Sequence, residues 1–296
     1  MEKELELNEI LLGETANTAR VMSAQGKVAD YIPELALVSP DLFSISCFLR
    51  SGELIETGDT THSFTMQSIS KILALSFAIE QFGVQTVFRH VGMEASADSF
   101  NSLMRIEMTS SKPSNPFMNA GAIAVCSLIY KAFKEHSLER LLAFFMDITG
   151  TTTSVNEAVF ASEKRSADRN RALAYFMKSM GLLHGSVEEI LDLYFRLCSL
   201  QCTTRELALT GETFAEDGFS TATGKRVLCH ETVTTVLGLM SSCGLYNGSG
   251  EFAVRVGIPG KSGVCGGVLA VVPGRMGISV FSPALDEKGN SVAGVK

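Results

Sequence analysis

The segment Phe64-Thr-Met-Gln-Ser-Ile-Ser-Lys71 leads directly into a long apolar run, Ile72–Phe82. Its first three residues are typical of a short strand, and the spacing of apolar residues in the run predicts a helix. Side chains three positions apart share one face of a helix, so Ser68 and Lys71 can touch. The segment therefore predicts a serine and a lysine in contact where a buried helix begins.

A serine and a lysine in this arrangement can carry out nucleophilic chemistry. Unsatisfied backbone N–H groups and the positive end of the dipole at a helix N-terminus favour a developing anion. A lysine partly buried there has a lowered pKa and can accept the proton of Ser68. This is the S-x-x-K pattern of serine acyl enzymes. The tetrapeptide alone is common, and a capping serine beside a solvated Lys71 is the competing interpretation.

A second element, Lys261-Ser262-Gly263, lies directly before the apolar run Val264–Val272. In S-x-x-K enzymes a K-[ST]-G triad lies on the strand beside the nucleophile, where its glycine lets the substrate approach the backbone. Taken alone, the triad could be a polar turn before a buried strand. Both elements occur in the expected order, so each supports the other.

Strands are predicted at both ends of the chain and helices between them. The strands are a hairpin over 42–49 and 54–57 with a turn at 50–53, followed near the C-terminus by Phe252–Val256, Val264–Val272 and Met276–Phe281. The helices cover about 5–24, then Ile72–Phe82, Ala120–Phe133, Leu138–Ile148, Ser154–Ser162, Arg169–Met180, Val187–Leu197 and Thr203–Phe214. This order predicts an α/β fold of the α+β type, with an antiparallel sheet built from both chain ends, flanking helices and a helical lobe. We expect one domain over 1–296, with a sheet-containing lobe at about 1–70 and 220–296 and a helical lobe at about 71–219.

Composition excludes several classes of partner. The 296 residues carry a net charge of −7 and no basic cluster, which argues against a nucleic-acid partner. No apolar run approaches the roughly 20 residues of a membrane helix, and the acidic first residues do not resemble a secretory signal. Seven scattered cysteines favour free thiols in a reducing cytoplasm over a disulfide framework. The five histidines form no metal-ligand pattern, so no metal or other cofactor is expected.

An ordered set of motifs extends from about Tyr31 to Gly294. It comprises Tyr31-Ile-Pro-Glu-Leu35, Gln67-Ser-Ile-Ser-Lys71, Asn115-Pro-Phe-Met-Asn-Ala-Gly-Ala-Ile123, Ser162-Glu163, Arg169-Asn170, Tyr194-Phe-Arg-Leu-Cys-Ser199, Ser242-Cys-Gly-Leu-Tyr246 and Pro259-Gly-Lys-Ser-Gly-Val264. With these motifs the sequence resembles the serine-dependent glutaminases, a family that includes bacterial enzymes and the catalytic domains of the animal kidney and liver types. The resemblance implies a serine β-lactamase-like fold, hydrolysis of L-glutamine to L-glutamate and ammonia, and a homo-oligomer, either a dimer or a tetramer.

The same resemblance implies a role for each matched residue. Ser68 is expected to be the nucleophile, Lys71 its general base and Tyr246 a proton relay, and Ser68 and Tyr246 are also expected to contact the substrate. The backbone N–H groups of Ser68 and Val264 would form the oxyanion hole. Glu163 would pair with the substrate ammonium, and the neutral side chains that would bind the α-carboxylate and the amide are Tyr31, Asn119, Asn170 and Tyr194.

Taken singly, each of these residues has a simpler interpretation. Glu163 could be a surface carboxylate, Asn119 a helix N-cap and Asn170 a solvated helix residue. Tyr194 and Tyr246 could be amphipathic core residues. Two other functions also compete with glutamine hydrolysis, namely a penicillin-interacting or esterase-like acyl enzyme and a non-catalytic glutamine sensor. The first is weakened because the triad is K-S-G rather than K-T-G, with no recognisable S-D-N element or deacylating glutamate. The second is weakened because a pure binder needs no activated nucleophile.

Overall fold

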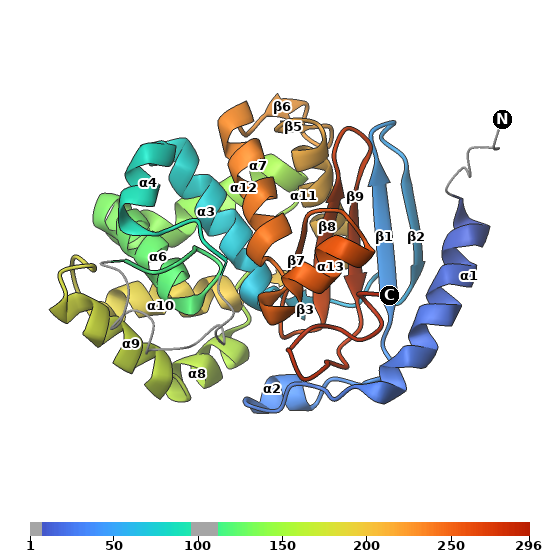
Figure 1. Ribbon diagram of the computed structural model, residues 1–296, viewed down its shortest axis with the longest axis horizontal. Coiled ribbons are helices and arrows are strands. Elements are labelled where there is room, and N and C mark those ends of the chain that lie inside the picture. The colour runs from blue at the N-terminus through green and yellow to red at the C-terminus, as the bar shows by residue number, and fades with distance from the viewer. Residues whose placement is uncertain (1–7, 96–111) are drawn as a thin grey trace.

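A five-stranded antiparallel sheet takes its strands from both ends of the chain (Figure 1). The computed structural model describes residues 8–95 and 112–296. The strand order is β2-β1-β9-β8-β7, so the N-terminal hairpin pairs with the C-terminal strands through β1 and β9. The strands are β1 (Ser44–Leu49), β2 (Leu54–Gly58), β7 (Gly260–Ser262), β8 (Gly267–Val272) and β9 (Met276–Phe281). The predicted antiparallel sheet built from both chain ends is confirmed.

Local sequence determines most of the strand limits. The hairpin of β1 and β2 turns at Gly52, whose φ of 86° favours glycine, and β9 has the predicted bounds. Strand β8 begins at Gly267 rather than at Val264, because residues 263–267 form a turn closed by a hydrogen bond from Gly263 N–H to Gly267 O of 2.9 Å. The K-S-G triad consequently has its own edge strand, β7, which pairs with β8.

The prediction of a strand over Phe252–Val256 is wrong, because this run lies mostly in helix α13 (Ser249–Arg255). A short apolar run fits either a strand or a helix, so periodicity cannot decide between them. Residues two positions apart lie on the same face of a strand, so Phe252 and Val254 would both be buried in a half-buried strand. Here Phe252 is buried whereas Val254 is 87% exposed. An ion pair between Glu251 and Arg255, four positions apart, also suits a helix.

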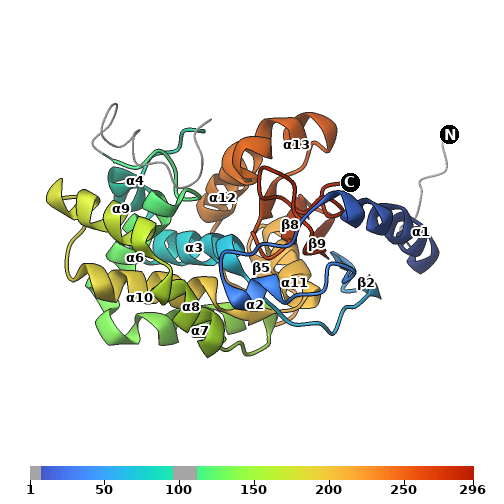
Figure 2. The ribbon, with the colours of Figure 1, turned by 90° about the horizontal axis from the view of Figure 1, so that it is seen from below.

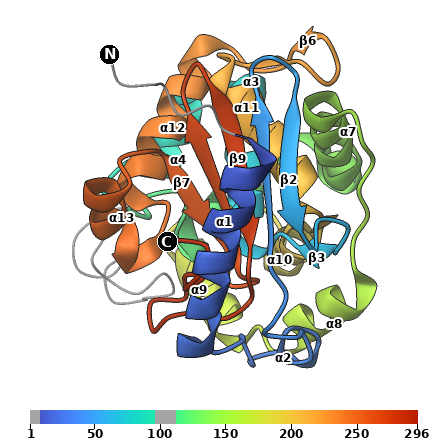
Figure 3. The same cartoon turned by 90° about the vertical axis from the view of Figure 1, so that its right-hand side faces the viewer.

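Helices cover both faces of the sheet (Figure 3). On one face α1 (Glu9–Arg20) packs through Leu12 and Ala16 against Ile45 and Cys47 of β1. On the other face α11 (Thr204–Ala215) lies along β1, β8 and β9. The approach of α11 requires Gly277, since a Cβ there would lie 2.2 Å from the Ala208 carbonyl oxygen. Sheet and helices thus form a layered arrangement.

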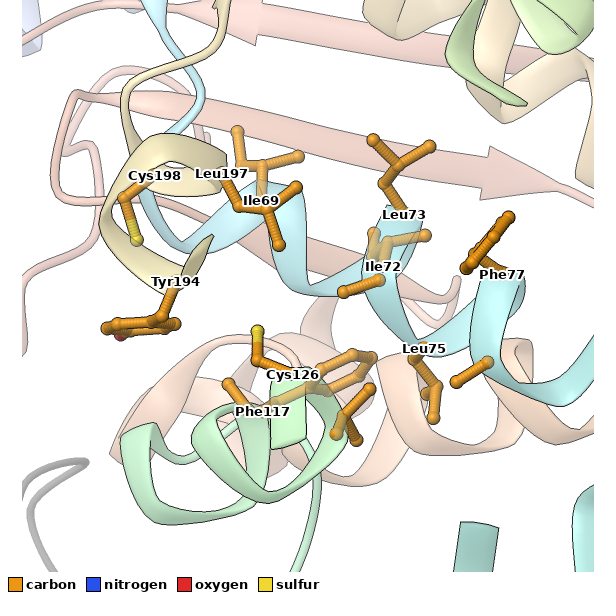
Figure 4. Close-up of a cluster of buried hydrophobic side chains, with 14 of the residues drawn as sticks. Ile69, Ile72, Leu73, Leu75, Phe77, Phe117, Cys126, Tyr194, Leu197 and Cys198 are labelled. Carbon is orange, nitrogen blue, oxygen red and sulfur yellow. The ribbon is translucent and has the colours of Figure 1, made fainter. Parts of the chain in front are cut away.

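A group of helices lies beside the sheet, with α3 (Ser70–Phe82) at its centre (Figure 2). Figure 4 shows the apolar side of α3 packed against residues from α6 and α10. The helices of this group are α4 (Val84–His90), α6 (Asn119–Phe133), α7 (Ser137–Thr149), α8 (Glu157–Arg165), α9 (Asp168–Ser179), α10 (Val187–Cys198) and α12 (His230–Cys243). Because α3 is buried from Ser70 to Ile79, it can hold reactive side chains at its N-terminus in a fixed position.

The predicted helices of the middle segment are confirmed, and their ends follow local capping. For example, α8 begins at Glu157 rather than Ser154 because Asn156 caps it by accepting a hydrogen bond from Val159 N–H. The predicted N-terminal helix corresponds to α1 and η1 (Val21–Gln25), while residues 5–7 lie outside the described part. Neither α4 nor α12 was predicted from the sequence. The remaining short elements are α2 (Pro33–Ala36), β3 (Phe64–Thr65), η2 (Gln67–Ile69), η3 (Lys134–His136), β4 (Gln201–Cys202), β5 (Phe219–Ser220), β6 (Lys225–Arg226) and η4 (Tyr246–Gly248).

Within residues 8–95 and 112–296, no helix has the length and apolar character required to cross a membrane.

Candidate active site

Ser68 lies on a tight turn between strand β3 and helix α3. The turn η2 continues directly into α3, and Met66 N–H anchors its start by donating to Leu200 O at 2.8 Å. Gln67 has a φ of 46°, a left-handed conformation that costs free energy in a non-glycine residue and occurs often at functional sites. This turn places Ser68, 8% exposed, at the wall of a cavity of about 340 Å³.

Lys71 follows on the first turn of α3 and is buried. Its Nζ donates to Phe117 O at 3.0 Å and to Asn119 Oδ1 at 2.8 Å, and no carboxylate in the described part of the chain forms an ion pair with it. Removal from water without a counter-charge disfavours the ammonium form, so burial lowers the pKa of Lys71 to about 8. A neutral amine is therefore accessible near physiological pH, as a general base requires.

Tyr246 interacts with the side chain of the same serine. It begins η4 with a φ of 51°, which is again left-handed. Burial raises the pKa of its phenol, while an interaction with the Ser68 side chain opposes that rise. The phenol thus keeps its proton at neutral pH and can donate or relay it. Tyr246, far from Ser68 in the sequence, thus lies beside it in the fold.

The same cavity collects all but one of the residues predicted to bind the substrate. It is lined by Tyr31, Ser68, Asn119, Glu163, Asn170, Tyr194 and Val264, whereas Tyr246 and the predicted base Lys71 do not line it. Two contacts preorganise the lining: Tyr31 Oη donates to Glu163 Oε1 at 2.7 Å, and Asn119 Nδ2 donates to Asn170 Oδ1 at 3.1 Å. Asn119 is the first residue of α6 and not its N-cap, which is Met118.

Glu163 supplies a carboxylate to this cavity. It is 8% exposed, and burial raises its pKa, although hydrogen bonds from Tyr31 and Gln67 oppose the shift. These bonds favour the ionised form, so Glu163 can offer a negative charge to a cationic group. A cavity lined by a serine, a carboxylate, neutral amides and phenols suits a small zwitterion.

Comparison with known proteins identifies the family. The family model described as glutaminase matches residues 26–296. The chain is 46% identical over 294 residues to the glutaminase of Alkaliphilus oremlandii, covering 99% of this chain and 95% of that protein. It is 48% identical over 279 residues to the glutaminase of Clostridium tetani, covering 94% and 91%. The chain belongs to the glutaminase family.

Solved glutaminase structures share the whole fold. A probable glutaminase, YbaS, superposes with a TM-score of 0.92 at 40% identity, covering 98% of this chain and 94% of that one. The probable glutaminase from Bacillus subtilis complexed with 6-diazo-5-oxo-L-norleucine gives a TM-score of 0.89 at 34% identity, covering 99% and 94%. The predicted β-lactamase-like fold and glutaminase function are confirmed, so the two alternatives, a penicillin-interacting or esterase-like enzyme and a non-catalytic glutamine sensor, are not retained.

The structure also brings residues to the glutaminase cavity that the sequence analysis did not select. Gln67 and Arg169 line it, although both stand inside quoted motifs. Gln67 Oε1 accepts from Tyr31 Oη at 3.2 Å, so it orients the same phenol that holds Glu163. Cys198 lines the cavity too, but burial raises the pKa of its thiol to about 12, which keeps it from acting as a thiolate nucleophile.

Proposed function

We propose that this glutaminase hydrolyses L-glutamine through an ester on Ser68, with Lys71 as the general base. One observation supports the proposal above all. Ser68 lines the cavity where a helix begins, and three residues later Lys71 is buried with two neutral hydrogen-bond acceptors and no carboxylate partner among the described residues. Neutral Lys71 takes the proton of Ser68 as Oγ attacks the carboxamide carbon. The N–H groups of Ser68 and Val264 receive the developing oxyanion.

Two half-reactions complete the cycle. The C–N bond breaks as Lys71, assisted by Tyr246, returns the proton to the leaving nitrogen, so ammonia departs and a glutamyl ester remains on Ser68. Water then attacks the ester while Lys71 takes one of its protons, and the ester C–O bond breaks to release glutamate and restore the serine hydroxyl. The substrate ammonium pairs with Glu163, and Tyr31, Asn119, Asn170 and Tyr194 bind the α-carboxylate and the amide.

Domain organisation, location and oligomeric state are proposed as well. We propose one catalytic domain over residues 1–296, a cytoplasmic location and a homo-oligomer, dimer or tetramer, as the family resemblance implies. All seven cysteines are free and six of them are buried, which suits a reducing compartment.

Covalent labelling tests the nucleophile. We expect 6-diazo-5-oxo-L-norleucine to add to the peptide that contains Ser68, as located by mass spectrometry, and Ser68→Ala to lose both the adduct and ammonia release. Cys198 is the internal comparison, because it lines the same cavity. An adduct on the Cys198 peptide instead of the Ser68 peptide would refute the serine assignment.

A further inference from the structure

Asn290, close to the C-terminus, is a buried amide to which no role has been assigned above. It is 2% exposed and does not line the substrate cavity. Ser262 Oγ donates to Asn290 Oδ1 at 2.6 Å, and Asn290 Nδ2 donates to Leu245 O at 3.2 Å. A carbonyl oxygen can only accept, so the Leu245 carbonyl requires the amide nitrogen on its side. One side chain therefore joins the end of β7 to the residue before Tyr246.

Both partners of Asn290 lie next to residues with a proposed part in the reaction. Leu245 precedes Tyr246, whose left-handed φ of 51° persists only where the surroundings hold it. Ser262 is the last residue of β7, and two positions later Val264 supplies the N–H proposed for the oxyanion hole. Asn290 thus connects the backbone of the proposed proton relay to the backbone of the proposed oxyanion donor.

The turn that carries Tyr246 fits closely around this amide. Gly248 N–H donates to Leu245 O at 2.8 Å, so the same carbonyl accepts from the turn and from Asn290. A Cβ at Gly248 would lie 2.9 Å from Asn290 Nδ2, which is closer than side-chain carbons approach. A residue other than glycine at position 248 would therefore displace the amide.

The loop that presents Asn290, residues 286–290, is itself fixed. Asp286 Oδ1 accepts from Asn290 N–H at 2.9 Å, and Asp286 N–H donates to Asn290 O at 2.8 Å. Lys288 Nζ donates to Glu251 Oε2 at 2.9 Å, which ties the loop to α13. The amide therefore extends from a closed loop and not from a free chain end.

The same loop lies directly against the two groups that it connects. Gly289 has a φ of 84°, which favours glycine. A Cβ at Gly289 would lie 3.7 Å from Val264 Cγ1 and 3.8 Å from Tyr246 Cε2, both ordinary contact distances. Tyr246 and Val264 thus have the loop as a common neighbour.

We propose that Asn290 is a positioning residue for the glutaminase reaction: its amide fixes the backbone of Tyr246 relative to that of Val264. The proton relay and the oxyanion donor must meet the same reacting group, so their separation has to be constant. A buried neutral amide can bond to both segments without the desolvation cost of a charge. The inference rests on the proposed function, because it uses the roles proposed there for Tyr246 and Val264.

Kinetics of two Asn290 variants test this role. Asn290→Leu has a similar shape and removes both hydrogen bonds, so we expect kcat to fall about 30- to 100-fold, as for a catalytic group misplaced by near 1 Å. KM should stay within about threefold, because the groups that bind the ammonium and the carboxylate are unchanged. Asn290→Asp keeps the acceptor for Ser262 Oγ but removes the donor to Leu245 O, and it should lower kcat by about tenfold or more. Asn247→Leu, exposed on the same turn as Tyr246, is the matched control and should keep the wild-type kcat.

Fluorine NMR of protein labelled with 3-fluorotyrosine reports the position of Tyr246 directly. The chain has five tyrosines, so the spectrum is simple, and Tyr246→Phe identifies the resonance. In Asn290→Leu we expect the Tyr246 resonance to shift, while that of Tyr194 on α10, which lines the cavity, stays in place. A residue that only stabilised the fold would lower the unfolding temperature and leave kcat and this resonance unchanged.

A wild-type kcat or an unmoved Tyr246 resonance in the folded Asn290→Leu variant overturns the proposal. Circular dichroism and thermal unfolding check the fold, and if Asn290→Leu does not fold, Asn290→Asp undergoes both measurements. Labelling by 6-diazo-5-oxo-L-norleucine separates this inference from the proposed function. A wild-type enzyme that is not labelled on Ser68 refutes the proposed function, whereas a labelled wild type with wild-type kcat in the variants counts against Asn290 alone.

Discussion

Lys71 lies at the start of α3 with its amine surrounded by a carbonyl oxygen and an amide oxygen instead of a carboxylate. A carboxylate would hold the proton on the amine and raise its pKa, whereas the observed neutral acceptors leave burial as the dominant influence. At the residue scale, the choice of hydrogen-bond partner therefore decides whether a buried lysine serves as a base. At Glu163 burial likewise favours the neutral form and raises the pKa, but hydrogen bonds from Tyr31 and Gln67 oppose that rise.

The pH dependence of activity should report Lys71. A base works only after losing its proton, so kcat/KM should rise with pH through about 8 and fall below it. Lys71→Arg keeps a positive charge that cannot be lost, and we expect kcat to fall by about a thousandfold or more. Steady-state ammonia assays between pH 6 and 10 measure both effects, with Lys131→Arg as the control. Substantial turnover in Lys71→Arg would remove Lys71 from the mechanism.

Glu163→Gln should affect binding more than turnover. The substrate ammonium is charged in the ground state and in the transition state alike, so loss of its counter-charge should raise KM and leave kcat nearly unchanged. A desolvated pair of this kind is worth roughly 2–4 kcal/mol, which corresponds to a KM about 30- to 1,000-fold higher. Glu157→Gln, on the same helix but exposed, is the matched control. An unaltered KM in Glu163→Gln would show that Glu163 does not bind the ammonium.

At the scale of elements, α11 is the helix that joins the sheet to the rest of the molecule, and it contains a buried carboxyl group. Glu212 is fully buried on α11, with Thr221 N–H donating to it at 3.5 Å. Burial, with a smaller contribution from the charge of Glu216, raises its pKa to about 7. The packing of α11 on the sheet is thus most favourable when Glu212 is protonated.

Glu212→Gln should stabilise the fold at neutral and alkaline pH but not at pH 4.5. The folded-state pKa lies above the unfolded value, so Glu212 contributes most at low pH and its contribution is lost as pH rises from about 4.5 through about 7. A neutral isostere avoids that loss and should raise the free energy of unfolding by up to about 3 kcal/mol at pH 8, with little change at pH 4.5. Urea unfolding at the two pH values measures it, with the exposed Glu231→Gln as the control. An equal gain at both values would mean that titration of Glu212 is not the cause.

At the scale of the whole molecule, the site joins elements that are far apart along the chain. Ser68 comes from η2, Asn119 from α6, Glu163 from α8, and Val264 from the turn between β7 and β8. Their separation is set by the packing of the helices against the sheet. Only a substrate of matching length can therefore contact both Ser68 and Glu163.

Glutamine should be preferred over asparagine by at least roughly a hundredfold in kcat/KM. Asparagine is one methylene shorter, so it cannot pair its ammonium with Glu163 while its carbonyl stays in the oxyanion hole. A displacement near 1 Å costs about a hundredfold in rate, and a missing methylene weakens binding by about 1–3 kcal/mol. Steady-state ammonia release from the two amides measures the ratio. Similar values would mean that Glu163 and Asn119 do not bind the far end of the substrate.

The sequence alone determined the features that depend on neighbours along the chain. The hairpin of β1 and β2 follows from alternation around Gly52, the helix α3 follows from apolar spacing, and Ser68 and Lys71 share a helix face because of their spacing. The motifs were also sufficient to predict the family and seven of the residues that line the cavity. These features are local, or are recognisable as motifs, so they can be read before any packing is known.

Only the tertiary structure decided the features that depend on burial by distant segments. The run Phe252–Val256 could have been a strand or a helix, and its packing, with Phe252 buried and Val254 exposed, belongs to α13. Lys261 could have met solvent, substrate or a carboxylate, but it is enclosed beside Tyr246. A pKa and a catalytic role depend on which groups surround a side chain in space, and those groups come from segments that no local pattern relates.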